Sequence, residues 1–161
     1  MFFRKRTVTV KREEDVYQKY PDSLTGHLNA SFAFCEYGRV KDMPDMGAVM
    51  VSIPGCDELP HYKAVEYIRN AGGLVSRICK EKIIRLQDGD FLVFSKDYKR
   101  LEERLDFFLR EFKEGEKLYA VASDAIDSNE SFEQFVNRIR RHTGTVAVSN
   151  AYKSCNLVKN T

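Results

Sequence analysis

The run Ala48–Ile53 constrains the fold of this chain more than any other stretch, because it is almost wholly apolar. A strand with one face in water alternates apolar and polar side chains, whereas a strand buried on both faces is apolar along its length. Pro54 and Gly55 follow the run and favour a break directly after it. We therefore expect a short, doubly buried strand in the middle of a sheet.

The next segment predicts a helix followed by strand material. Pro60 suits the first turn of a helix, and the pair Gly72-Gly73 suits its end. The apolar residues between them recur at helical spacing, namely Ala64, Val65, Ile68 and Ala71. Strand material is then expected within Leu74–Leu86.

Helix and strand signals alternate again in the second half of the chain. Asp97 can cap a long helix that Gly115 stops. The apolar stripe of this helix would consist of Tyr98, Leu101, Leu105, Phe108 and Phe112. A strand is expected over Leu118–Ser123. A helix opened by the capping-box sequence Ser-Phe-Glu-Gln at 131–134 follows, and then a final strand over Thr145–Ser149.

The first part of the chain is expected to contribute a pair of strands. Thr7–Lys11 and Leu28–Tyr37 both alternate between apolar and polar residues, as half-buried strands do. We interpret residues 1–46 as an N-terminal extension whose strands pack on the main sheet. Residues 47–152 would form the main domain, and residues 153–161 a flexible tail.

From Ala48 onward the expected order is β-α-β-β-α-β, followed by a further α-β. This order is that of the ferredoxin-like split βαβ, an α+β fold in which helices cover one face of a four-stranded antiparallel sheet. The two inner strands would be Ala48–Ile53 and Phe91–Ser95, which are among the most apolar stretches of the chain. The pattern and the topology therefore agree.

A candidate site lies at Asp88-Gly89-Asp90, between the apolar runs Ile83–Leu86 and Phe91–Phe94. It is typical of a β-hairpin with two carboxylates at its tip, and such a tip can hold a divalent metal beside a phosphate. The same three residues also suit an ordinary tight turn, in which the glycine supplies positive φ and the aspartates bond local amides. Both interpretations stay open at this point.

The stretch from Arg85 to Phe94, RLQDGDFLVF, resembles the Arg-Leu-Gly-Gly-Asp-Glu-Phe hairpin in the palm of GGDEF-type nucleotide cyclases and CRISPR-associated polymerases. The resemblance covers roughly residues 48–150. It implies a palm fold in which carboxylates at the hairpin and at the end of the first strand chelate two divalent ions, Mg²⁺ or Mn²⁺. These ions would polarise a triphosphate and activate an attacking hydroxyl.

The chain departs from the family pattern at both positions. Where the resemblance implies an aspartate at the end of the first strand, the sequence reads Val-Ser-Ile-Pro at 51–54, and the first acid is Asp57. The paired glycines of the hairpin are reduced to Gly89. The candidate metal ligands are therefore Asp88, Asp90 and Asp57. These departures favour a degenerate palm that binds a nucleotide without turning it over, and whether the chain is an enzyme stays open.

Basic residues supply candidate partners for phosphate. The chain has 26 Lys and Arg against 24 Asp and Glu, a net charge of +2 that by itself does not imply nucleic acid. The basic residues nevertheless cluster at 4–12 and at 138–142. The candidate phosphate-binding residues are Lys96, Arg138, Arg140 and Arg141. Electrostatic binding of single-stranded nucleic acid through these clusters is an alternative function.

The absence of several well-known motifs from the sequence excludes the classes of protein that depend on them. The sequence contains no Walker loop, no dinucleotide glycine fingerprint and no Gly-x-Ser-x-Gly elbow. Its four cysteines are widely spaced without a Cys-x-x-Cys pair, which favours reduced thiols and a cytoplasmic location. Neither a secretory signal nor a membrane span is expected at the N-terminus. A protein-binding domain of the inhibitor, immunity or adaptor type, or a homodimer, remains the other alternative.

Overall fold

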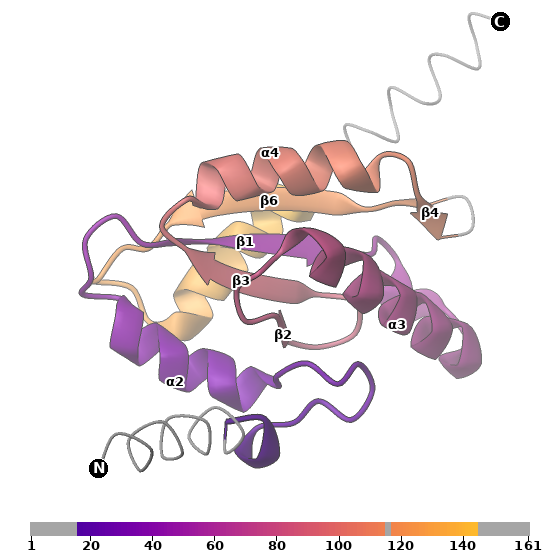
Figure 1. Cartoon of the computed structure of the whole chain (residues 1–161), viewed down its shortest axis with the longest axis horizontal. Coiled ribbons are helices and arrows are strands. Elements are labelled where there is room, and N and C mark those ends of the chain that lie inside the picture. The colour runs from indigo at the N-terminus through magenta and orange to yellow at the C-terminus, as the bar shows by residue number, and fades with distance from the viewer. Residues whose placement is uncertain (1–15, 115–116, 145–161) are drawn as a thin grey trace, which may run out of the picture.

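The structure is a computed structural model that describes residues 16–114 and 117–144. A four-stranded antiparallel sheet with the strand order β2-β3-β1-β6 organises it (Figure 1). The elements are α2 (Ala30–Val40), β1 (Gly47–Ser52), the 3₁₀ helix η1 (Cys56–Glu58), α3 (His61–Ile78), β2 (Ile84–Arg85), β3 (Phe91–Ser95), α4 (Tyr98–Leu109), β4 (Lys113–Glu114), β5 (Lys117–Leu118) and β6 (Ala120–Ala125). A further helix covers residues 132–144, and β4 and β5 pair as a separate ribbon.

The main sheet confirms the expected topology. The elements β1, α3, β2, β3, α4 and β6 follow one another as β-α-β-β-α-β, and β1 and β3 are the two inner strands. Val49 of β1 lies opposite Val93 of β3 and Ser123 of β6. All six residues of β1 are buried, as its apolar run predicts. The strand predicted over Leu118–Ser123 is present as β6, shifted toward the C-terminus.

Helices cover both faces of the sheet, whereas the sequence predicted helices on one face. Alternate residues of β1 point to opposite sides, so Val49 and Val51 enter one core and Ala48 and Met50 enter another. The helices α3 and α4 pack on the first core. The helix α2 and the helix over 132–144 pack on the second. Figure 1 shows this last helix, in yellow-orange, behind the sheet.

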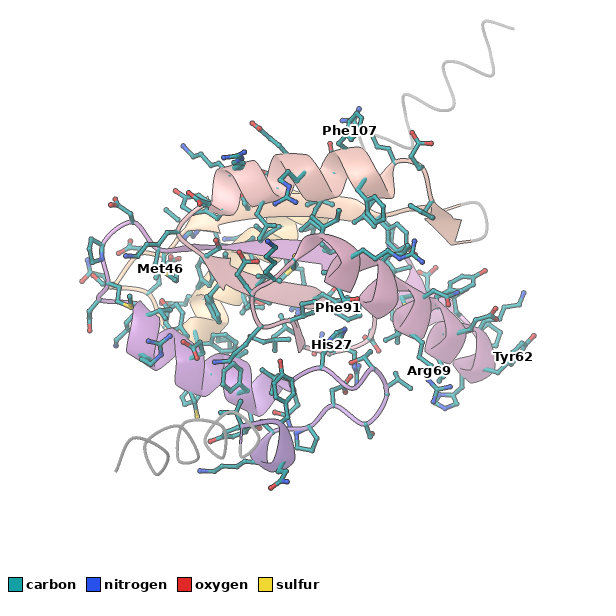
Figure 2. The ribbon with its side chains drawn as sticks, in the orientation of Figure 1. His27, Met46, Tyr62, Arg69, Phe91 and Phe107 are labelled. Atoms are coloured by element: carbon teal, nitrogen blue, oxygen red, sulfur yellow. The ribbon has the colours of Figure 1, made fainter. Side chains whose placement is uncertain are left out.

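Figure 2 shows which side chains around α3 and α4 lie in the core and which face solvent. Phe91 of β3 lies fully buried beneath α3, where it belongs to the first core. Phe107 of α4 points away from the sheet and is 78% exposed. The side of α4 that faces the sheet carries Leu101, Leu105 and Leu109. The apolar stripe predicted for this helix is therefore confirmed for its leucines, although the helix ends before Phe112.

The prediction of a strand over Leu28–Tyr37 is wrong, because this segment forms most of α2. Asn29 caps the helix, because its side chain accepts a hydrogen bond from the Phe32 amide. The buried side chains of α2 recur at helical spacing and are Phe32, Ala33, Tyr37 and Val40. Phe34, which a strand would place on the same face as Phe32, is 65% exposed. Thr7–Lys11, the other predicted N-terminal strand, lies outside the described residues.

The predicted end of α3 at Gly72-Gly73 is also wrong, because the helix continues to Ile78. Gly72 is needed for close packing rather than for a helix end. A Cβ at this position would lie 3.3 Å from the His27 ring and 3.4 Å from the Phe91 ring. The His27 ring also hydrogen-bonds the Gly72 carbonyl at 3.1 Å. The glycine thus lets the N-terminal segment approach α3 closely.

The capping box predicted at residues 131–134 is confirmed. The Gln134 amide donates to the Ser131 hydroxyl at 3.1 Å, and the Ser131 amide donates to the Gln134 side chain at 3.0 Å. The predicted stop at Gly115, the strand Thr145–Ser149 and the C-terminal tail lie outside the described residues. No helix in the described part of the chain is both long and apolar enough to cross a membrane.

A buried ion pair joins the N-terminal segment to β2. Asp22 is 5% exposed, and the Arg85 Nε lies 3.0 and 2.9 Å from its two carboxylate oxygens. The Thr25 hydroxyl donates to the same carboxylate. Burial by itself raises the pKa of Asp22, but the hydrogen bonds from Arg85 and Thr25 and the Arg85 charge outweigh it. The pKa of Asp22 therefore lies below its ordinary value.

This lowered pKa predicts a loss of stability in acid. A carboxyl group whose pKa is lower in the folded state stabilises the fold above its unfolded pKa, which is about 3.9 for aspartate. The contribution disappears as the pH falls through the folded pKa. We expect the advantage of the wild type over Asp22→Asn in free energy of unfolding to be full at about pH 6 and to shrink below about pH 4. Urea unfolding across this range measures it, and an advantage that grows on acidification would contradict the assignment.

Candidate functional site

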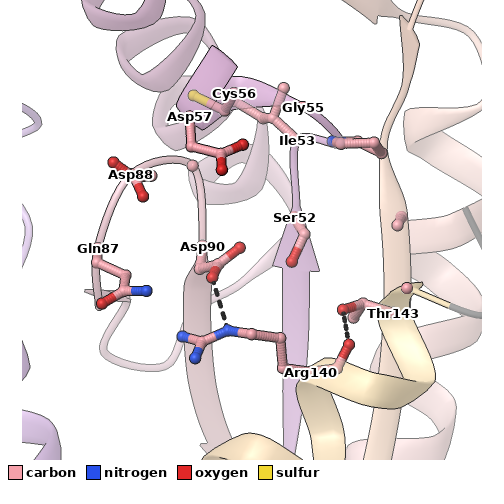
Figure 3. Close-up of a pocket in the computed structure, with 14 residues that line it drawn as sticks. Ser52, Ile53, Gly55, Cys56, Asp57, Gln87, Asp88, Asp90, Arg140 and Thr143 are labelled. Carbon is pink, nitrogen blue, oxygen red and sulfur yellow. Dashed lines mark hydrogen bonds and ion pairs between the residues drawn. The ribbon is translucent and has the colours of Figure 1, made fainter.

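A cleft of about 420 Å³ lies between the end of β1 and the hairpin that joins β2 to β3 (Figure 3). Four segments line it: residues 52–57 at the end of β1, residues 87–90 at the hairpin tip, Ala120 at the start of β6, and the end of the helix over 132–144. The polar side chains in the lining are Ser52, Asp57, Gln87, Asp88, Asp90, Arg140 and Thr143. The fold thus brings Asp57 to the same cleft as the two hairpin aspartates.

The hairpin tip is fixed against the end of β1 by a glycine contact. The Ile53 amide donates to the Gly89 carbonyl at 3.2 Å. A Cβ on Gly89 would lie 2.9 Å from the Ile53 Cβ, too close for any other residue without a shift. The positive φ of the turn is at Asp88, with φ 44°, and not at the glycine as the sequence suggested. Gly89 is therefore required for close packing, and this packing holds the hairpin beside β1.

The three aspartates of the cleft have different surroundings. Asp90 is half-buried, and its carboxylate accepts a hydrogen bond at 3.0 Å from the Arg140 Nε (Figure 3). Asp57 and Asp88 are exposed, and no described residue pairs with either carboxylate. No three His, Cys, Asp or Glu side chains among the described residues are grouped so that they could hold a metal ion. As far as the described residues show, the cleft therefore contains two unpaired carboxylates and one that is paired with Arg140.

Ser52 is a cleft residue that was not among the site residues predicted from the sequence. It ends β1 and is 8% exposed. Its hydroxyl has no hydrogen-bond partner among the described residues. A serine at a strand end is common, and only the packing around it distinguishes this one. A polar residue closing a doubly buried strand was the one signal in the sequence.

The candidate phosphate-binding residues separate into two groups. Arg140 lines the cleft. Arg138 instead lies near the opposite end of the sheet, where it contacts Asp124 and Glu130 and donates to the Ala125 carbonyl at 2.9 Å. Asp124 pairs with Ala48 at the start of β1, far along the strand from Ser52. The hydrogen bonds from Arg138 to Glu130 raise the pKa of Arg138, and they outweigh burial, which lowers it.

Lys96 and Arg141 do not line the cleft either. Lys96 follows Ser95, which lies opposite Gly47 at the start of β1, and it borders a separate hollow with Asp45 and Asp97. Arg141 is exposed on the helix over 132–144. Of the four predicted basic residues, only Arg140 thus belongs to the candidate site. The basic cluster at 4–12 lies outside the described residues.

Comparisons with known proteins identify the fold. No protein-family model matches the chain, and no curated protein matches it. Solved structures of GGDEF domains do resemble it. The GGDEF domain of FimX from Pseudomonas aeruginosa has a TM-score of 0.60 at 14% identity and covers 80% of this chain and 93% of that chain. The diguanylate cyclase SiaD of the same organism, solved with its activator SiaC, has a TM-score of 0.63 at 16% identity. This match covers 91% of this chain and 66% of the SiaD chain.

A third similar structure is a microbial GGDEF domain described for its interaction with bis-(3′,5′)-cyclic di-GMP. It has a TM-score of 0.60 at 13% identity and covers 82% of this chain and 92% of that chain. These likenesses confirm the palm-type fold that the hairpin and the element order predicted. The chain therefore has the fold of GGDEF domains, with a cleft between the hairpin and the end of β1.

Proposed function

We propose that this chain is a nucleotide-binding palm domain and that its ligand enters the cleft together with a divalent cation. The observation that carries the proposal is the convergence of Asp57, Asp88 and Arg140, from three separate segments, on one cleft of about 420 Å³. Clefts of this size are typical of small-molecule sites. The interaction of a similar GGDEF domain with cyclic di-GMP supports a nucleotide as the ligand class.

The charge of the cleft explains why a cation would be needed. Three aspartates and one arginine line it, so that two negative charges remain once Arg140 is paired with Asp90. A bare phosphate would be repelled by Asp57 and Asp88. Mg²⁺ is usually held by one or two carboxylates together with the phosphates of the substrate, and not by a cage of protein ligands alone. The two free carboxylates therefore fit a metal that arrives with a nucleotide, although they do not form a site for the metal by itself.

We further propose that the domain binds a nucleotide without cyclising it. The resemblance to the palm of GGDEF-type cyclases implies that two-metal chemistry uses acidic ligands both at the hairpin and at the end of the first strand. This chain has Ser52 at the strand end, and its hairpin acid Asp90 is paired with Arg140. Incubation with GTP and Mg²⁺ or Mn²⁺ should accordingly yield no cyclic dinucleotide under conditions in which the nucleotide binds.

Thermal unfolding in four conditions tests the proposal: buffer, Mg²⁺ alone, nucleotide with EDTA, and nucleotide with Mg²⁺. GTP and cyclic di-GMP are the probes, and ATP is the comparison. We expect a clear rise in Tm only when metal and nucleotide are present together. A rise with Mg²⁺ alone would mean that the protein holds a metal by itself. No rise in any condition would reject nucleotide binding and favour the protein-interaction alternative.

A further inference from the structure

The hydroxyl of Ser52, which lines the same cleft, is buried and has no hydrogen-bond partner among the described residues. Buried polar groups in folded proteins nearly always have a hydrogen-bond partner, because a desolvated and unpaired group destabilises the fold. Ser52 is more than nine-tenths buried and yet lacks one among the described residues. It also lines the cleft. A ligand in the cleft can therefore supply the hydrogen-bond partner that the Ser52 hydroxyl lacks.

Several polar groups of the lining are already engaged with one another. Ser52 lies opposite Ala120 of β6, which has no polar side chain to offer. The Thr143 hydroxyl donates to the Arg140 carbonyl at 2.7 Å, and the Arg140 side chain donates to Asp90 (Figure 3). The Thr143, Arg140 and Asp90 side chains thus have partners other than Ser52. Among the described residues, none supplies the Ser52 hydroxyl with a partner.

Resting on the nucleotide-binding function proposed above, we infer that Ser52 donates a hydrogen bond to a phosphate oxygen of the ligand. A serine hydroxyl can donate or accept, so the surrounding groups decide its role. Asp57 and Asp88 on the rim accept only, whereas Arg140 on the other side donates only. A metal-bound phosphate between them would place its cation at the carboxylates and its oxygens toward Ser52 and toward the terminal nitrogens of Arg140, since Asp90 is bonded through Nε. Ser52 is then a specificity residue for the anionic part of the ligand.

The variant Ser52→Ala should change ligand affinity and stability in opposite directions. Without ligand, the variant should unfold at the same Tm as the wild type or at a higher one, because it loses only an unpaired buried hydroxyl. Its affinity for GTP with Mg²⁺, measured by calorimetric titration, should fall by roughly 10-fold or more, as expected for a lost hydrogen bond to a charged group. A purely structural serine would show a drop in Tm with unchanged affinity.

Ser123→Ala is the matched control. The Ser123 hydroxyl donates to Glu102 at 2.7 Å and belongs to β6, outside the cleft. Its removal should lower the Tm and leave the affinity for GTP with Mg²⁺ unchanged. If Ser52→Ala binds as tightly as the wild type, or unfolds at a clearly lower Tm, the assignment of Ser52 is overturned while the nucleotide site stands. If the wild type itself does not bind, the proposed function fails and the assignment fails with it.

Discussion

Replacing Arg85 with methionine is expected to lower the free energy of unfolding by roughly 3–5 kcal/mol. The change keeps much of the side-chain volume but leaves Asp22 as a buried carboxylate without its cation. Asp22 is 5% exposed, and Arg85 holds both of its oxygens at 2.9 to 3.0 Å. Removing one partner of such a pair costs much more than removing both, because the remaining charge stays desolvated. Equilibrium urea unfolding measures the loss.

The double variant Asp22→Asn/Arg85→Met is the control for this prediction. It removes the charge as well as its partner, so its loss should be clearly smaller than that of Arg85→Met alone. Arg110→Met provides a second control, because the Arg110–Asp106 pair is exposed on α4 and should contribute less than about 1 kcal/mol. A loss below about 1 kcal/mol for Arg85→Met would show that the ion pair does not hold the N-terminal segment on β2.

The double variant Asp57→Asn/Asp88→Asn should lower the affinity for GTP with Mg²⁺ by roughly 100-fold, from two lost charge-assisted contacts of about 1.5 kcal/mol each. Both residues are exposed, so the fold should be unaffected. In EDTA the effect of the double variant on the affinity for GTP should reverse. The variant should bind GTP as well as the wild type or better, because two charges that repel phosphate have been removed. Calorimetric titration with and without metal measures both effects.

Two other exposed aspartates provide a matched control for charge. Asp45→Asn/Asp97→Asn changes the net charge by the same amount, but these residues border a hollow at the opposite end of the sheet. We expect no change of affinity with Mg²⁺ or in EDTA. An equal loss in the two double variants would mean that overall charge, and not the cleft, governs binding. The proposed site would then be wrong.

Much of the fold could be predicted because the strands carry strong signals. β1 is apolar along its length, and its burial on both faces follows directly from that. The segment Leu28–Tyr37 was mispredicted because a short apolar stretch with alternation suits both a strand and a helix. The cap at Asn29 and the spacing of Ala33, Tyr37 and Val40 favoured the helix. Gly72 was misread as a helix end because close packing against another segment leaves no local trace in the sequence.

The candidate site was predictable only in part. The hairpin motif identified Asp88 and Asp90, and the topology placed the end of β1 beside them. Arg138 and Arg140 are separated by two positions on a helix and therefore point to different sides, and only tertiary packing decides which one faces the cleft. Arg138 forms ion pairs with Asp124 and Glu130. The unpaired state of Ser52 likewise depends on neighbours that are distant in the sequence.

Calorimetric titration of the wild-type protein with GTP, once in Mg²⁺ and once in EDTA, tests the central claim most directly. We predict one binding site per chain in Mg²⁺ and an affinity at least about tenfold weaker in EDTA, since two unpaired carboxylates in the cleft repel phosphate without a cation. Equal affinity in the two buffers would contradict the role assigned to Asp57 and Asp88. Absence of binding in both would contradict the nucleotide-binding function.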